Sequence, residues 1–324
     1  MKILVRLPNW LGDMVMSVGF IHQLPHFFPG AEISVIAKKG IHDLLTYFPA
    51  LKHKFIFNKE EFKGIRGLIE YGRQVKRTEN FDLFFCLPDS FSAAVMGAAT
   101  GSKKRIGYKK ELRQLLLTHS YKKPENLHRA EEYVRLIEFF TKQEQKPLDV
   151  YLKHDYHKKD YIVININSEA SSRRLTIAKA VEILGLLRHS IEQRLVLVGA
   201  PKEAEFISAV LNQLKNRNNI ENLAGKTSLG QLVELLASAR LILTTDSGPA
   251  HLANALGTHT VVLFGAGKES NTAPYNKNLR NIIRLGQLSC EPCEKNVCVR
   301  YGTPQCLERL DSMRIIETIK LQLN

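Results

Sequence analysis

Short runs of β-branched and aromatic residues alternate along the whole chain with amphipathic stretches of helical period. In the first half this pattern predicts strands at residues 3–7, 33–37, 54–57, 82–87 and 105–108, and helices at 13–24, 41–47, 62–77, 91–100 and 129–143. In the second half it predicts strands at 161–166, 194–198, 241–244 and 260–264, and helices at 177–189, 202–215, 229–238 and 313–323. Such alternation is typical of parallel sheets with helices on both faces.

A polar stretch at residues 142–159, which contains Pro147, separates the two halves. The 324 residues exceed what one compact core usually fills. We therefore predict an α/β protein with two doubly wound, Rossmann-like domains over residues 1–155 and 156–324. Because open α/β sheets bind ligands outside the carboxyl ends of their strands, we expect the site in a cleft between the two domains.

The segment LILTTDSGPAHLANALG at residues 241–257 carries the most specific chemistry. It predicts a strand that delivers Asp246, Ser247 and Gly248 to the start of a helix. The first backbone N–H groups of a helix lack intrahelical partners and its dipole favours an anion, so this turn is suited to a phosphate. His251 lies four residues after Ser247 and shares its helix face. It is either a ligand-binding side chain or a packed or capping histidine.

A second segment of the same design opens the chain, where RLPNWLGDM places Asp13 at the start of the first predicted helix. Asp13 is either a general base at the cleft or a carboxylate that interacts with the helix dipole, and spacing alone does not decide between them. Arg173 and Arg174 follow the strand at 161–166. They are either cations for a diphosphate, whose geometry a guanidinium matches, or a surface pair.

The net charge of +14 indicates attraction to polyanions, which include nucleic acid, an anionic membrane leaflet and phosphorylated substrates. No nucleic-acid-binding signature accompanies the basic clusters, and GxGxxG and P-loop motifs are absent. No apolar run of 18 or more residues occurs, and Met1 leads directly into a strand. We expect a cytosolic protein without a membrane span.

Four of the five cysteines are gathered near the C-terminus, at Cys290, Cys293, Cys298 and Cys306, whereas Cys86 lies alone in a predicted strand. Four cysteines are the ligand set of an all-cysteine zinc site, but their spacing is not that of two zinc knuckles. The alternative is a set of reduced thiols that brace a loop.

Three blocks in the same order complete the picture: RLPNWLGDMVMS at residues 6–17, NLAGKTSLG through VVLFG at 222–265, and the tail with CEPC, Cys298 and Cys306. Together they resemble the family 9 glycosyltransferases, the ADP-heptose:lipopolysaccharide heptosyltransferases, and the first block is most similar to the heptosyltransferase II branch. The resemblance implies a GT-B architecture, in which the first domain mainly holds the acceptor and the second mainly holds the nucleotide-sugar.

Carried over by position, the resemblance makes Asp13 the catalytic base, with Asn9, Trp10 and Gly12 on the acceptor side. It assigns donor binding to Thr245, Asp246, Ser247, Gly248 and His251, and we count Arg173 and Lys226 with them. One difference concerns the first loop of the second domain, where the family commonly has a lysine followed by Arg-Trp-Pro. Here the sequence is Ser-Arg-Arg-Leu-Thr at residues 172–176, which leaves the donor open.

The activity that the resemblance implies is an inverting, metal-independent transfer of heptose from ADP-heptose to the inner core of lipopolysaccharide. We expect no cofactor, no nucleic-acid partner, a monomer, and transient contact with the anionic inner face of the cytoplasmic membrane. The alternatives are a GT-B transferase or epimerase that uses another nucleotide-sugar, and a non-catalytic basic α/β protein that binds nucleic acid.

Overall fold

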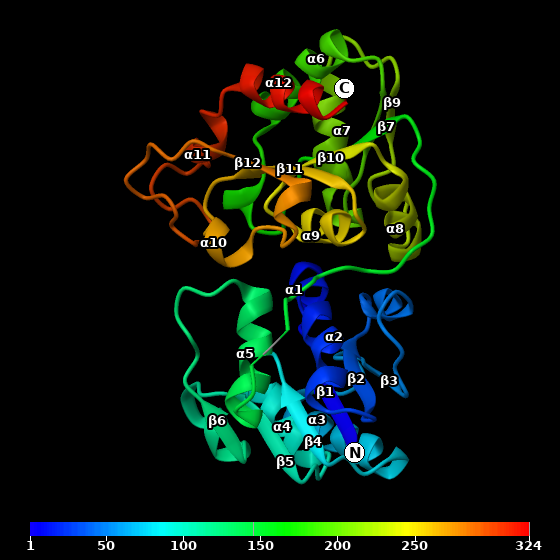
Figure 1. Cartoon of the computed structure of the whole chain (residues 1–324). Helices are drawn as coiled ribbons and strands as arrows, with labels where there is room; N and C mark the ends of the chain where they lie inside the picture. The colour runs from blue at the N-terminus through cyan, green and yellow to red at the C-terminus, as the bar shows by residue number, and fades with distance from the viewer. Residues whose placement is uncertain (145, 324) are drawn as a thin grey trace. The chain divides into compact units, whose positions relative to one another are not determined.

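The computed structural model describes residues 1–144 and 146–323, which form two compact units, Met1–Leu152 and Lys153–Asn324. Each unit has one parallel sheet of six strands flanked by helices (Figure 1). The sequence pattern thus predicted the α/β class correctly. The division between the units lies after Leu152, and the sequence pattern predicted a boundary after residue 155.

Unit 1 has the sheet order β3-β2-β1-β4-β5-β6. α3 packs against α4, and α2 against α5. The strands are β1 (Lys2–Arg6), β2 (Glu32–Lys38), β3 (Lys54–Phe57), β4 (Leu83–Cys86), β5 (Lys104–Tyr108) and β6 (His119–Tyr121). The helices are α1 (Leu11–Met16), α2 (Val18–Phe27), α3 (Gly64–Thr78), α4 (Phe91–Ala99) and α5 (Arg129–Thr141), with 3₁₀ turns η1 (His42–Thr46) and η2 (Glu111–Leu116).

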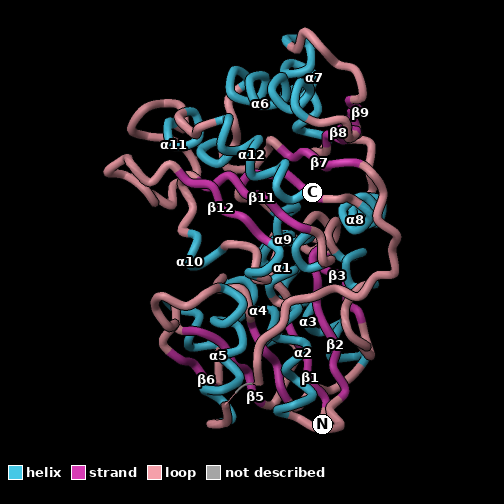
Figure 2. Tube along the Cα trace, turned by 45° about the horizontal axis from the view of Figure 1, so that its top comes forward, coloured by secondary structure: helices cyan, strands magenta, loops and turns pink. Residues whose placement is uncertain are grey.

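Unit 2 has the sheet order β12-β11-β10-β7-β8-β9, which repeats the topology of unit 1. Figure 2 shows the strands and helices of both units in different colours. Its strands are β7 (Tyr161–Asn165), β8 (Arg194–Leu197), β9 (Ile220–Asn222), β10 (Leu241–Thr245), β11 (His259–Phe264) and β12 (Arg280–Arg284). Its helices are α6 (Ile177–Ser190), α7 (Ala204–Gln213), α8 (Leu229–Ser238), α9 (Gly248–Ala255), α10 (Glu269–Thr272), α11 (Gln305–Glu308) and α12 (Ser312–Leu323), with 3₁₀ turns η3 (Ser171–Arg173), η4 (Pro201–Glu203) and η5 (Lys277–Leu279).

The central strands of both sheets are covered on both faces, which explains their continuous apolar sequences. Every residue of β7 and β10 is buried. In register, Ile3 of β1 pairs with Ile33 and Leu83 on its two sides, and Leu243 of β10 pairs with Val261 and Ile164. Within the described residues, no helix is both long enough and apolar enough to cross a bilayer.

Three details differ from the predicted elements. The single helix expected at residues 13–24 is divided into α1 and α2 at Ser17, whose hydroxyl donates to the carbonyl of Met14 at 2.7 Å and so competes with the helical ladder. Residues 41–47 form only the short turn η1. β6, β9 and β12 were not predicted because they are edge strands of three to five residues with few fully buried positions.

Candidate functional site

Both units have the 3-2-1-4-5-6 strand order of a Rossmann fold, in which ligands bind where the strand order reverses. In unit 1 this switch point lies between β1 and β4, and in unit 2 between β7 and β10. The loop after β1 leads to Asp13, in the first turn of α1, and the loop after β4 contains Asp89. The loops after β7 and β10 contain Arg173 and Asp246. Three of the predicted charged residues, Asp13, Arg173 and Asp246, therefore follow the strands at the two switch points.

Asp13 is partly exposed and has two neighbours on one face of α5. The hydroxyl of Tyr133 donates to Asp13 Oδ1 at 3.5 Å, and Arg129 Nε lies 4.0 Å from the same oxygen. Tyr133 is buried, and burial together with the charge of Asp13 raises its pKa well above the usual value. The phenol therefore stays protonated at neutral pH and remains a hydrogen-bond donor to the carboxylate.

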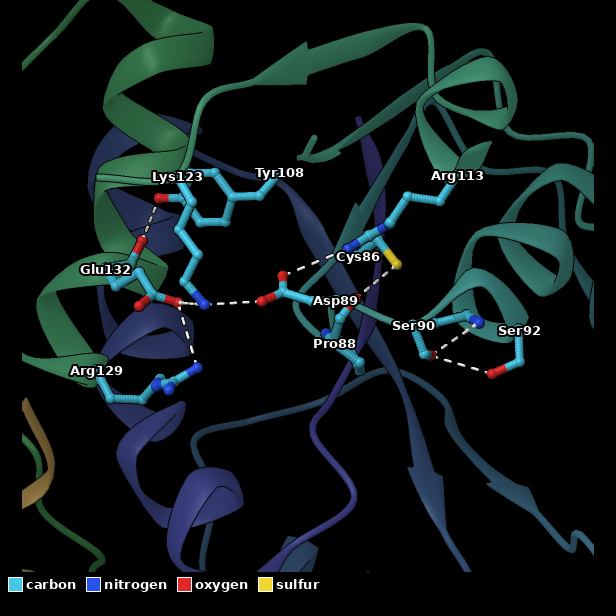
Figure 3. A network of polar contacts seen from close by, with 11 residues as sticks. Cys86, Pro88, Asp89, Ser90, Ser92, Tyr108, Arg113, Lys123, Arg129 and Glu132 are labelled. Atoms are coloured by element: carbon cyan, nitrogen blue, oxygen red, sulfur yellow. Dashed lines mark hydrogen bonds and ion pairs between the residues drawn. The ribbon is translucent and has the colours of Figure 1, made fainter. Parts of the chain in front are cut away.

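Beyond Arg129, positive and negative side chains alternate along the edge of the sheet (Figure 3). Arg129 Nη1 lies 3.5 Å from Glu132 Oε1, and Lys123 Nζ lies 2.8 Å from the same oxygen. Lys123 also contacts Asp89 Oδ2 at 2.7 Å, and Arg113 Nη1 contacts Asp89 Oδ1 at 3.3 Å. Burial raises the pKa of Glu132, but its two cationic neighbours oppose this effect. The network holds α5, and with it Arg129 and Tyr133, beside Asp13.

The three residues that we expected on the acceptor side precede Asp13, in the loop after β1 and in the first turn of α1. Asn9 Oδ1 accepts a hydrogen bond from the buried Arg6 guanidinium, which fixes the loop to the strand. Trp10 precedes α1 and is 58% exposed, with Lys38 Nζ 5.7 Å from its ring centroid. Gly12 lies in the first turn of α1 and is partly exposed. An exposed indole is a suitable surface on which a sugar ring can pack.

In unit 2, the guanidinium of Arg173 and the carboxylate of Asp246 form an ion pair, with Nη1 3.3 Å from Oδ2. Asp246 is only 4% exposed, and it packs against Gly267 in the loop after β11. A Cβ at position 267 would lie 2.1 Å from Asp246 Oδ2, so only glycine leaves room for the carboxylate there. The segments that follow the neighbouring strands β7, β10 and β11 thus contribute one residue each to this site.

A hydrogen-bonded cluster shapes the start of α9. Asn165 Nδ2 donates to Ser247 Oγ at 2.8 Å, and the Thr245 hydroxyl donates to the carbonyl of Asn167 at 2.6 Å. Thr245 and His251 are buried, whereas Gly248, at the first position of the helix, is partly exposed. Thr245 therefore joins the two loops, which leaves Ser247 and Gly248 as the more accessible residues of the predicted donor loop.

The first turn of α9 offers fewer amides than a helix start usually does. Pro249 has no N–H group, and the N–H of Ala250 donates to the carbonyl of Ser247 at 3.1 Å. A bound phosphate would therefore depend more on Arg173 than the sequence pattern alone suggests.

Lys226 follows a different strand from the two strands that precede Arg173 and Asp246. It follows β9 at the edge of the sheet, it is exposed, and its Nζ donates to the carbonyl of Asn222 at 3.0 Å. Among the described residues, Lys226 forms no hydrogen bond or ion pair with Arg173 or Asp246.

The four C-terminal cysteines are free thiols that line one cavity of about 20 Å³. Burial raises the pKa of Cys306 to about 11, which disfavours its thiolate. Across the described residues, no group of three or more His, Cys, Asp and Glu side chains is placed to hold a metal ion. The cysteine loop also contacts the Arg173 loop, where the carbonyl of Asn296 accepts from the N–H of Ser172 at 3.2 Å.

Comparison with known proteins places this arrangement in a family. The profile of glycosyltransferase family 9 (heptosyltransferase) matches residues 69–302. The chain belongs to glycosyltransferase family 9. It is 31% identical to lipooligosaccharide heptosyltransferase 2 of Haemophilus ducreyi, over 88% of this chain and 89% of that protein. It is 25% identical to lipooligosaccharide heptosyltransferase 2 of Campylobacter jejuni, over 99% of this chain and 98% of that protein.

The structure of Escherichia coli ADP-heptose LPS heptosyltransferase II has the same architecture, with a TM-score of 0.85 and 25% identity over 100% of this chain and 98% of that one. This family 9 chain is thus a glycosyltransferase with the GT-B fold, as its sequence blocks predicted.

Several residues of the site were not recognised in the sequence: Asp89, Lys123, Arg129, Glu132 and Tyr133 in unit 1, and Asn165 and Gly267 in unit 2. Two of them follow a rule that was available. Asp89 lies two residues after the strand predicted at 82–87, and Asn165 is the next-to-last residue of the strand predicted at 161–166, so both lie at the carboxyl edge of a parallel sheet. The α5 residues carry no such local signal.

Proposed function

We propose that this family 9 glycosyltransferase moves a heptose from ADP-heptose to the inner core of lipopolysaccharide with inversion at the anomeric carbon. The observation that carries the proposal is the presence of a supported carboxylate at the switch point of unit 1 and a buried cation–carboxylate pair at the switch point of unit 2. The names of its full-length relatives supply the sugar and the class of acceptor.

In this reaction Asp13 accepts the proton of the acceptor hydroxyl while that oxygen attacks the anomeric carbon and ADP leaves. Tyr133 and Arg129 keep the carboxylate oriented. Negative charge that develops on the leaving diphosphate needs a fixed cation, and Arg173 is the residue that can supply it. Because Arg173 is paired with Asp246, the diphosphate has to share or displace that carboxylate when it binds.

The acceptor is proposed to lie against Asn9, Trp10 and Gly12, and the nucleotide-sugar against Ser247, Gly248 and His251. We further propose that the enzyme acts as a monomer, without a metal ion, at the inner face of the cytoplasmic membrane. Transfer that persists unchanged in a chelator would support the metal-independent mechanism, and transfer that a chelator abolishes would refute it.

The test combines calorimetry with a transfer assay. We expect ADP to bind more tightly than UDP or GDP, and heptose to be transferred from ADP-heptose to a heptose-deficient lipopolysaccharide core. Asp13→Asn should lower kcat by about 10²- to 10⁴-fold and leave ADP affinity unchanged. Asp43→Asn, which removes an exposed carboxylate in η1 of the same unit, is the matched control.

Three results would overturn the proposal in different ways. Stronger binding of UDP or GDP would indicate another nucleotide-sugar. Full activity of Asp13→Asn would remove Asp13 from the base role. A product that keeps the anomeric configuration of the donor, determined by NMR, would exclude a single displacement.

A further inference from the structure

The short turn η2 of unit 1 has an inverted distribution of polarity. Arg113 is 1% exposed, whereas Leu112 and Leu115 are 68% and 77% exposed. A 3₁₀ helix has three residues per turn, so side chains at i and i+3 lie one above the other. Leu112 and Leu115 therefore present one apolar face to the solvent. Large exposed side chains grouped in this way mark an interaction surface more often than isolated ones do.

This inversion is built into the packing beneath η2. The Arg113 guanidinium reaches inward to Asp89, as Figure 3 shows, at 3.3 Å. Gly107 of β5 makes room for it, because a Cβ there would lie 3.0 Å from Arg113 Nη2. On the same side, Arg105 Nε donates to the carbonyl of Leu116 at 2.8 Å. The backbone is thus held from the inside, and this arrangement directs the two leucines outward.

Positive charge borders the apolar face. Lys109 and Lys110 directly precede η2 and are exposed, and neither has an ion-pair partner among residues 1–144 and 146–323. Lys122 follows β6, the strand next to β5, so it lies at the same edge of the sheet and is also exposed. Glu111 is the one acidic residue of the segment 109–116.

We propose that the lobe at residues 109–116 docks on the surface of an anionic phospholipid bilayer, with Leu112 and Leu115 in the interfacial region and the lysines at the lipid phosphates. Charge complementarity selects this partner, because apolar side chains flanked by amines match the acyl chains and headgroups of such a surface. The loop after β5 lies at the same carboxyl edge of the unit 1 sheet as Asp13. The inference rests on the proposed function in one respect: the lipid-anchored acceptor would bind at this edge of the unit 1 sheet.

The first experiment measures co-sedimentation of the full chain with vesicles of phosphatidylcholine, with and without phosphatidylglycerol. We expect binding that needs the anionic lipid and weakens with salt. The double variant Leu112→Ser/Leu115→Ser should bind at least about tenfold more weakly. Leu321→Ser is the matched control, because Leu321 of α12 is 74% exposed but lies outside the lobe.

A second pair of variants tests the charge. Lys109→Glu/Lys110→Glu should also reduce binding to anionic vesicles by about tenfold or more, whereas Lys320→Glu in α12 should have a much smaller effect. Equal losses in the lobe and control variants would show general charge attraction and overturn the assignment. Loss of a dimer in the leucine variant, measured by analytical ultracentrifugation, would show instead that the lobe binds a second copy of the chain.

A transfer assay separates this inference from the proposed function. With a soluble, deacylated acceptor, the leucine variant should keep the kcat and KM of the native protein, but with an acceptor embedded in anionic vesicles its KM should rise about tenfold. If the native protein transfers no heptose yet binds vesicles through the lobe, the proposed function fails and the docking surface stands. If transfer proceeds and the leucine variant matches the native protein on vesicles, the docking surface fails.

Discussion

Substitution of Gly267 by alanine tests whether the buried Arg173–Asp246 pair organises the donor side of unit 2. The added Cβ would lie 2.1 Å from Asp246 Oδ2 and 3.2 Å from Phe264 Cε1. The carboxylate must therefore move by roughly 1 Å in a close-packed environment, and overpacking of this kind costs about 1–3 kcal/mol. The movement also separates Asp246 from Arg173, which lies only 3.3 Å away. We expect the free energy of unfolding of unit 2 to fall by about 1–3 kcal/mol.

The effect can be measured by scanning calorimetry, where each 1 kcal/mol corresponds to about 2–4 °C in Tm for a unit of this size. ADP binding should weaken in the same variant, because Arg173 no longer has a fixed position. Gly185→Ala in α6 is the control: a Cβ there meets nothing within 4 Å, and alanine should stabilise the helix by about 0.5–1 kcal/mol. If Gly267→Ala keeps both the Tm and the ADP affinity of the native protein, our account of the pair is wrong.

Three further predictions concern unit 1. Tyr133→Phe removes the donor to Asp13, so kcat/KM should fall by about two- to tenfold, as expected for the loss of one hydrogen bond; an unchanged kcat/KM would count against the contact. Trp10 is the only tryptophan, so acceptor binding should change the intrinsic fluorescence, and a constant spectrum at saturating acceptor would exclude Trp10 from that site. Lys2 and Lys52 lower the pKa of Glu79, so its stabilising effect is present above a pH of about 4.5 and is lost as the pH falls through the lowered pKa. Glu79→Gln should therefore cost about 1 kcal/mol at pH 7 and progressively less as the pH is lowered below about 4.5, as a series of urea unfolding curves at different pH values can show.

Much of the site could be located from sequence because it lies where strands end. Asp13 and Asp246 each lie where an apolar strand is followed by a helix, and this local order is enough to place them at the carboxyl edge of a parallel sheet. The three sequence blocks then indicated family 9 and the GT-B fold, and the comparisons confirmed both. The order of elements along the chain did not reveal that the Thr245 hydroxyl donates to a backbone carbonyl of the protein. It also did not reveal that Lys226 follows an edge strand, away from the Arg173–Asp246 pair.

The amino-acid sequence by itself determined the alternation of strands and helices, the two-unit organisation and the position of each candidate residue along its own element. These follow from periodicity and turn chemistry, which act over a few residues. Only the tertiary structure decided which side chains meet. Tyr133 reaches Asp13 across 120 residues, and Gly267 makes room for Asp246, because strand order and helix packing bring their elements together. The turn η2 was likewise decided by the tertiary structure. The sequence shows three leucines near Arg113, but only the packing of Arg113 against Gly107 and Asp89 determines which leucines face the solvent.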